Sequence, residues 1–395
     1  MIQNLQNKRV GLVLPNVPAY SETFFTSKIK GLQENGFEVI LFANRKLSHS
    51  YNLTRVVYAP DFTIKFRLLF ELVKMSWNIV SNFNSAFSLY KITRKEETSL
   101  KNAIRTVLIN SHFLPFKLDW LHFGFGTMAI QRENVAEAIG AKMAISFRGF
   151  DLYIYPTKHI NCYQKLFSKN VRYHVLSNEM KNTLMGNGIS EQSIFKITPA
   201  IDFDSFNRKT PLDFNSPIRF LTVGRLHWKK GLEYTLEALS YFKQNKNIPF
   251  TFTIIGDGVE TERLKFAVYQ LGLTENVIFV GKVAHQEVKK YMDQSHVYLQ
   301  YSIQEGFCNA VLEAQAMGLL CIVSDADGLV ENVIDQETGW VIPKRNAILL
   351  AQKMADVLQL EETKAQMIKK NAMERVKNEF NLEKQNALFL SFYSN

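Results

Sequence analysis

A short basic segment at residues 223–231, VGRLHWKKG, combines residue types that could bind phosphate. Gly224 would let the backbone turn tightly after a preceding strand, and Arg225 and Lys230 could then project from the same loop. Two fixed cations suit a dianionic diphosphate, and an arginine guanidinium can bind two oxygens at once. A solvated helix start at Lys229 and Lys230 is the alternative interpretation.

A second segment, EGFCNAVLE at residues 305–313, carries two carboxylates. Glu305 would follow a strand and a helix would begin near 307–309, so that backbone N–H groups at the helix start could bind phosphate. Gly306 would keep that approach open. Glu313 could accept hydrogen bonds from two ribose hydroxyls, and Glu305 could reach a sugar. Two unrelated acidic residues are the alternative, because this spacing is also common by chance.

The elements that must position these segments alternate between strand and helix. After about residue 215, strands are expected at 219–224, 250–256, 277–281, 297–302 and 320–325, and helices at 232–244, 259–272, 286–295, 309–318 and 349–360. This alternation is typical of a parallel sheet covered by helices, which binds ligands at the carboxyl ends of its strands. Both segments fall at such strand ends.

The first half shows the same alternation. Its strands are expected at 10–15, 38–43, 120–123, 143–147, 172–176 and 194–198, and a helix at 23–35. A stretch rich in Asp, Asn, Pro and Ser at 201–217 indicates the boundary. We therefore expect an α/β protein with two doubly wound, Rossmann-like domains facing a cleft.

Composition excludes several classes of protein. The 395 residues are 46% hydrophobic and 21% charged, which argues against a disordered or collagen-like chain. Cys162, Cys308 and Cys321 lie far apart and suggest neither a disulfide framework nor a zinc site, which fits a reducing, cytoplasmic compartment. No window approaches the ~20 apolar residues that a membrane-spanning helix needs.

Charge is distributed unevenly. Residues 1–210 contain 27 lysines and arginines against 15 aspartates and glutamates, whereas the remainder is close to neutral. Within the first half, residues 62–108 combine apolar and aromatic residues at helical spacing with eight basic residues. A basic amphipathic helix of this kind can bind an anionic membrane surface. Nucleic acid as the anionic partner, a surplus of charge that serves solubility, and an ordinary pair of helices packed on a core are the alternatives.

The second half resembles glycosyltransferase family 4, which contains retaining nucleotide-sugar transferases of the GT-B fold. The resemblance covers about 220–343 and rests on six motifs in family order and spacing, namely VGRLHWKKGLEYTLEAL, FTIIGDGVETERL, VIFVGKV, EGFCNAVLEAQAMG, SDADGLVENVID and TGWVIP. It implies a donor-binding domain at 206–377 and an acceptor-binding domain at 1–205. It also implies that a last helix, about 378–395, packs back on the acceptor-binding domain.

The resemblance also implies roles for individual residues. Arg225 and Lys230 would bind the donor diphosphate, Glu313 the ribose, and Glu305 the donor sugar near the reacting carbon. Sugar and phosphate would also contact the backbone of five consecutive positions, Gly306, Phe307, Cys308, Asn309 and Ala310. Val283 would lie beside the nucleotide base.

The first half resembles the family more loosely, through SETF at 21–24, HFG at 122–124 and FRGFD at 147–151. The first two are typical of a subgroup that assembles exopolysaccharides and capsules. Arg148 stands where the family often has a histidine near the donor sugar. Because arginine cannot act as a base at neutral pH, we expect Arg148 to bind phosphate or a sugar hydroxyl. Pairing of Arg148 with Asp151 is the alternative.

Two further motifs point to other chemistries. Asp325-Ala326-Asp327 spells the DxD of metal-binding transferases, but the family needs no metal there, because the arginine, the lysine and helix N–H groups can neutralise the diphosphate. Gly256-Asp257-Gly258 does not complete a dinucleotide fingerprint, which argues against an oxidoreductase.

The sequence therefore predicts a metal-independent, retaining glycosyltransferase without a cofactor. Its donor would be a nucleoside-diphosphate sugar and its acceptor a glycan or a polyprenyl-diphosphate-linked glycan. We expect it in the cytoplasm or on the inner face of the cytoplasmic membrane, without a nucleic-acid partner. A non-catalytic binding module, a nucleotide-sugar epimerase and a phosphorylase remain alternatives.

Overall fold

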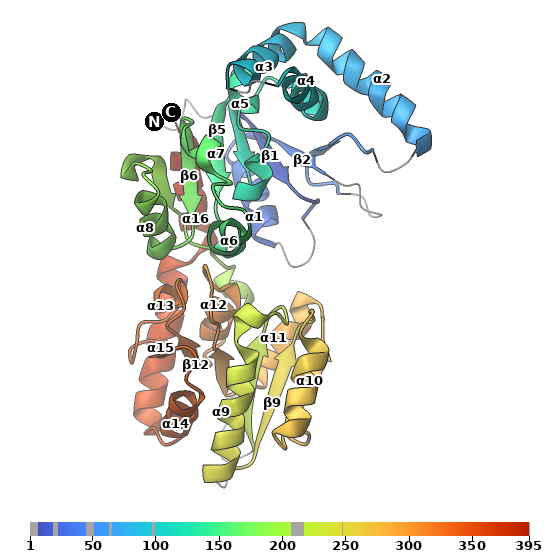
Figure 1. The fold of residues 1–395 in the computed structure, drawn as a ribbon. Coiled ribbons are helices and arrows are strands. Elements are labelled where there is room, and N and C mark those ends of the chain that lie inside the picture. Colours follow the sequence, from blue (N-terminus) through green and yellow to red (C-terminus); the bar gives the residue numbers. More distant parts are fainter. Residues whose placement is uncertain are drawn as a thin grey trace. The chain divides into compact units, whose positions relative to one another are not determined.

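The protein is described by a computed structural model, which covers residues 7–18, 23–44, 51–62, 65–96, 99–206, 217–246 and 248–394. The chain forms two compact units (Figure 1). The first contains Met1–Ile197 together with Asn386–Asn395, and the second contains Thr198–Gln385.

The first unit ends earlier than residue 205, and the second continues beyond 377. Two contacts explain the difference. Ile201 forms a parallel bridge with Asn381, and the Nζ of Lys289 donates to the Ser205 carbonyl at 3.0 Å. The segment after Ile197 therefore packs with the second unit.

The first unit is built on a seven-stranded sheet in the order β3-β2-β1-β4-β5-β6-β7, in which all neighbours are parallel. Apolar residues run almost continuously through β1 and β2, because both faces of such a sheet are covered. Its strands are β1 (Arg9–Leu14), β2 (Glu38–Ala43), β3 (Arg55–Tyr58), β4 (Trp120–Phe123), β5 (Lys142–Ser146), β6 (Val171–Val175) and β7 (Ile194–Lys196).

Two helices far apart in the sequence cover one face of this sheet. Phe25 and Ile29 of α1 (Thr23–Glu34) share a buried cluster with Val10 of β1 and with Phe392 and Tyr393 of α16 (Leu382–Tyr393). The remaining α-helices of the unit are α2 (Lys65–Ser81), α3 (Phe83–Glu96), α4 (Leu100–Ile109), α5 (Val135–Ala138), α6 (Tyr155–Lys158), α7 (Gln164–Phe167) and α8 (Asn178–Gly186).

A chain of buried polar side chains crosses the interior of the first unit. The Nε2 of His122 lies 2.8 Å from the Ser146 hydroxyl, which lies 2.7 Å from the Nδ1 of His174. The His122 Nδ1 contacts the Tyr393 hydroxyl and lies 3.2 Å from the Lys28 ammonium. Burial lowers the pKa of Lys28 well below its ordinary value, and the charge of Arg148 adds to that effect. The histidine of the HFG motif is therefore a buried structural residue.

The second unit is built on a six-stranded parallel sheet in the order β10-β9-β8-β11-β12-β13. The strands are β8 (Ile218–Val223), β9 (Phe250–Ile255), β10 (Val277–Gly281), β11 (Val297–Gln300), β12 (Leu320–Ser324) and β13 (Trp340–Ile342). The α-helices are α9 (Leu232–Asn245), α10 (Thr261–Gln270), α11 (His285–Asp293), α12 (Asn309–Ala316), α13 (Leu329–Asn332), α14 (Ala347–Leu358) and α15 (Glu362–Glu379).

The predicted last helix differs from the structure at its start. A break at Phe380 and Asn381 separates α15 from α16, so α16 begins at Leu382 and not at 378. Its later residues, from Asn386, belong to the first unit.

Candidate active site

The basic loop follows β8, one of the two central strands of the second sheet. The Leu226 N–H donates to the Asp257 carbonyl at 3.0 Å, which fixes the loop against the segment that follows β9. Gly231 ends the loop at a φ of 60°, and a Cβ on it would lie 2.3 Å from the Tyr301 carbonyl oxygen. Glycine is required there for both reasons. The loop is thereby held against the end of β11.

The Lys230 ammonium forms an ion pair with the Glu305 carboxylate, which also accepts a hydrogen bond from Ser302 at 3.4 Å. The two charged side chains are only 14% and 11% exposed. Burial alone would lower the pKa of Lys230, but the Glu305 carboxylate outweighs that effect and raises it. The charge of Arg225 acts against this rise, so the exposed Arg225 lies within electrostatic reach of Lys230. The structure thus pairs two predicted site residues, Lys230 and Glu305, within electrostatic reach of a third, Arg225.

Asp327 holds the backbone of Glu305. Its carboxylate accepts from the Glu305 N–H at 3.2 Å, and the Gly328 N–H donates to the Glu305 carbonyl at 2.8 Å. A Cβ on Gly328 would lie 1.9 Å from the Gly306 carbonyl oxygen, so the two loops touch through their backbones. Asp325 accepts from the Lys344 N–H at 2.9 Å. Both carboxylates of the DxD motif therefore accept backbone hydrogen bonds, and the described residues contain no cluster suited to a metal ion.

The helix after Glu305 begins where the sequence predicts. The side-chain amide of Asn332 accepts from the Cys308 N–H at 3.0 Å and donates to the Cys308 carbonyl at 3.1 Å, which fixes the residue before α12. Burial raises the pKa of the Cys308 thiol to about 12, so it stays protonated. The predicted positions Gly306, Phe307, Asn309 and Ala310 lie on either side of this fixed residue.

The second carboxylate of the motif has a partner that sequence reasoning did not identify. The Nε2 of His285 lies 3.0 Å from the Oε1 of Glu313, and the Glu313 side chain is 12% exposed. His285 is the first residue of α11, two positions after Val283. The hydrogen bond to Glu313 raises the pKa of His285 above its ordinary value. The one available signal was the nearness of His285 to Val283, the position expected beside the base.

Arg148 belongs to the first unit. Asp151 accepts from the Arg148 backbone N–H at 2.7 Å and from the Gly126 N–H at 2.6 Å. The Arg148 guanidinium lies 3.9 Å from the centre of the Phe24 ring, a cation–π contact. Burial raises the pKa of Asp151 to about 6, against the opposing effect of these N–H groups and the Arg148 charge. The contact that Asp151 accepts from Arg148 thus comes from the backbone N–H. Ser21 and Glu22 of the SETF motif lie outside the described residues.

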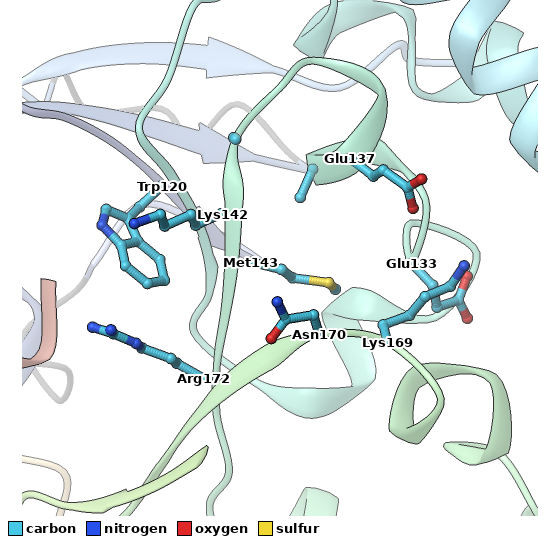
Figure 2. Close-up of a pocket in the computed structure, with 10 residues that line it drawn as sticks. Trp120, Glu133, Glu137, Lys142, Met143, Lys169, Asn170 and Arg172 are labelled. Carbon is cyan, nitrogen blue, oxygen red and sulfur yellow. The ribbon is translucent and has the colours of Figure 1, made fainter. Parts of the chain in front are cut away.

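A cavity of about 440 Å³ lies elsewhere in the first unit (Figure 2). Trp120, Lys142 and Arg172, from the starts of β4, β5 and β6, line one part of it. Glu133 and Glu137 also line it, so the cavity has both acidic and basic side chains in its wall. Ligands of parallel sheets bind at the opposite edge, where the strands end. No residue predicted for the site lines this cavity.

The fold is that of GT-B glycosyltransferases. The chain superposes on sucrose-phosphate synthase from Thermosynechococcus elongatus with a TM-score of 0.73 and 16% identity, covering 98% of each chain. It superposes on Anabaena HepE, determined in complex with UDP-glucose, with a TM-score of 0.72 and 13% identity, covering 98% of this chain and 100% of that one.

Sequence comparison then defines the family. Residues 204–375 match the model of glycosyl transferases group 1. The chain is 30% identical over 280 residues to the amylovoran biosynthesis glycosyltransferase AmsK of Erwinia amylovora, covering 68% of each. The chain belongs to the glycosyl transferases group 1 family and is a glycosyltransferase.

Two other relatives match more of the chain. The putative colanic acid biosynthesis glycosyltransferase WcaL of Escherichia coli K12 is 26% identical over 393 residues, covering 94% of this chain and 96% of WcaL. An Escherichia coli UDP-Gal:alpha-D-GlcNAc-diphosphoundecaprenol alpha-1,3-galactosyltransferase is 25% identical over 323 residues, covering 78% of each. These comparisons confirm the family that the sequence motifs indicated.

Proposed function

We propose that the enzyme transfers a sugar, with retention of configuration and without a metal ion, from a nucleoside-diphosphate sugar to a hydroxyl of a glycan or a polyprenyl-diphosphate-linked glycan. The observation that carries the proposal is the buried Lys230–Glu305 pair beside the exposed Arg225. The names of the colanic acid, amylovoran and diphosphoundecaprenol relatives support a role in cell-surface polysaccharide synthesis.

In this proposal Lys230 and Arg225 stabilise the negative charge that develops on the diphosphate leaving group. The bond between the anomeric carbon and the diphosphate oxygen breaks, and the acceptor oxygen bonds to the same carbon. The acceptor proton passes to an oxygen of the leaving phosphate, so no protein base is needed. In the same proposal Glu305, which is paired with the lysine assigned to the diphosphate, contacts the donor sugar. Oriented charges of this kind are usually the largest catalytic contribution.

A thermal-shift panel tests the donor assignment. UDP, GDP, ADP and their glucose conjugates are added to the full chain with and without EDTA. A ligand at 100 times its Kd adds about 2.7 kcal/mol of stability. We expect one nucleotide to raise the Tm equally in both conditions. Binding that EDTA abolishes would contradict metal independence, and a panel without any shift would contradict the donor site. Consumption of the bound donor without acceptor, giving an isomeric nucleotide sugar, would favour the epimerase.

We also propose that an anionic membrane surface binds the first unit through α2 and α3. Five large apolar side chains of α2 are largely exposed: Leu69, Phe70, Val73, Trp77 and Val80. Phe83 and Phe87 of α3 are exposed too and stack at 5.9 Å. Exposed basic side chains lie on these two helices and on the neighbouring α4: Lys74, Lys91, Lys95, Lys101 and Arg105. Apolar area beside positive charge fits an anionic lipid surface. No described helix is long and apolar enough to span a bilayer.

Vesicle sedimentation tests this surface. We expect the protein to bind vesicles of phosphatidylglycerol and phosphatidylcholine, with salt weakening that binding. Trp77→Glu should reduce binding several-fold, because it places a negative charge on the apolar face. Phe266→Glu, at an exposed apolar residue of α10, is the matched control and should bind normally. Equal binding to pure phosphatidylcholine in high salt would contradict the proposal.

A further inference from the structure

Glu313 does not stand alone in the second unit. His285, at the start of α11, approaches it to 3.0 Å from an element that follows β10, whereas Glu313 lies on α12, which follows β11. Because a carboxylate at the second turn of a helix can rotate about its side-chain bonds, a donor from a neighbouring helix fixes one of its oxygens in place. The other lone pairs of the carboxylate stay available as acceptors.

His285 also contacts an aromatic side chain. The Phe206 ring meets the imidazole edge-on, with ring centres 5.7 Å apart. Lys289 lies 4.4 Å from the centre of that Phe206 ring, and its ammonium donates to the Ser205 hydroxyl at 2.9 Å. This row of contacts orients the imidazole so that its Nε2 faces Glu313.

We propose that His285 is a positioning residue, which orients the Glu313 carboxylate for the two ribose hydroxyls of the donor nucleotide. This inference rests on the proposed function, because it takes Glu313 as the ribose ligand. It adds a residue to the donor site, and it assigns that residue an effect on nucleotide affinity and not on the transfer step.

The inference predicts a pH dependence of donor affinity. The charged groups that act on His285 are Glu313, which favours the imidazolium, and Lys289 on its own helix, which opposes it. Since the pKa of His285 is raised, its charged hydrogen bond to Glu313 is fully present below the ordinary histidine pKa. That bond loses its charge as the pH rises through the raised pKa. The affinity for an anionic nucleotide sugar should therefore fall over that interval.

The experiment compares UDP and GDP with their 2′,3′-dideoxy analogues by calorimetry on the full chain. A hydrogen bond to a charged group is worth roughly a tenfold change in affinity or more, so the wild type should prefer the ribose form of the nucleotide that binds by at least that factor. Glu313→Gln should lose most of the preference. His285→Leu, which keeps an apolar contact for Phe206, should reduce it several-fold. The double variant should lose no more than Glu313→Gln alone.

Two further variants separate positioning from folding. His285→Gln retains an N–H near the position of Nε2, so it should keep the ribose preference but lose the pH dependence of UDP-glucose or GDP-glucose affinity. Gln286→Ala, at the exposed next residue, should match the wild type in both. In steady-state kinetics His285→Leu should raise the KM for the donor with little change in kcat.

The outcomes distinguish the inference from the proposed function. If the wild type prefers ribose, Glu313→Gln loses that preference and His285→Leu keeps it in full, the role of His285 is overturned and the donor site stands. If the wild type shows no preference, Glu313 is not the ribose ligand, and both the assignment and the inference fall. If His285→Leu loses the ribose preference and also has a lowered Tm, and if His285→Gln restores neither, His285 is a purely structural residue and the inference is overturned.

Discussion

Lys230→Met should be both nearly inactive and less stable than the wild type. The substitution removes a charge assigned to the diphosphate, which typically costs 10²–10³ in kcat. It also leaves the Glu305 carboxylate, only 11% exposed, without its ammonium partner. Breaking a buried ion pair from one side costs roughly 3–5 kcal/mol. Urea unfolding and initial rates of sugar transfer measure the two effects separately.

The double variant Lys230→Met/Glu305→Met is the control for this prediction. Replacing both members of a buried pair by apolar residues is often neutral or stabilising, so stability should return towards the wild-type value. Activity should not return, because the diphosphate still lacks its cation. A single variant as stable as the wild type would show that the pair contributes nothing to folding.

Arg225→Ala should lose activity without losing stability. Arg225 is exposed and forms no ion pair with any residue that the structure describes, so the folded state depends little on it. If it stabilises charge on the leaving group, its removal should lower kcat by roughly 10²–10³. We expect the Tm to stay unchanged and nucleotide affinity to fall as well, since the guanidinium also binds the ground-state diphosphate.

Arg263→Ala provides a matched comparison for Arg225→Ala. Arg263 is an exposed arginine of α10 in the same unit, paired with Glu233 at 2.8 Å and outside the predicted site. This variant should retain wild-type kcat and nucleotide affinity. An Arg225→Ala enzyme with wild-type kcat would show that the exposed cation of the loop has no catalytic role.

The positions of most strands along the chain can be predicted because each is short and apolar and most alternate with amphipathic helices. Two strands were not predicted. β3 (Arg55–Tyr58) is an edge strand of four residues, too short for a periodic pattern to identify. β13 (Trp340–Ile342) has three residues and follows the left-handed Gly339, so it is too short for alternation of apolar and polar residues to indicate a strand.

The partners of the site residues were harder to predict than the residues themselves. Local motifs indicate Lys230 and Glu305 individually, but the two residues lie 75 positions apart, and no pattern in one sequence indicates that their side chains meet. His285 and Glu313 are separated by 28 positions and come from different helices. Such pairs depend on the order of strands in the sheet, which places the ends of β8, β10 and β11 on one edge.

The return of α16 has a consequence for how the protein is made. Phe389, Phe392 and Tyr393 belong to the core of the unit whose other residues end at Ile197. A ribosome adds about 5–20 residues per second, so this aromatic group emerges roughly 10–40 s after the rest of its unit. During that interval the hydrophobic face formed by β1 and α1 lacks its cover. The second unit can fold first, although it is synthesised later, and the nascent first unit is the part of the chain that a chaperone would protect.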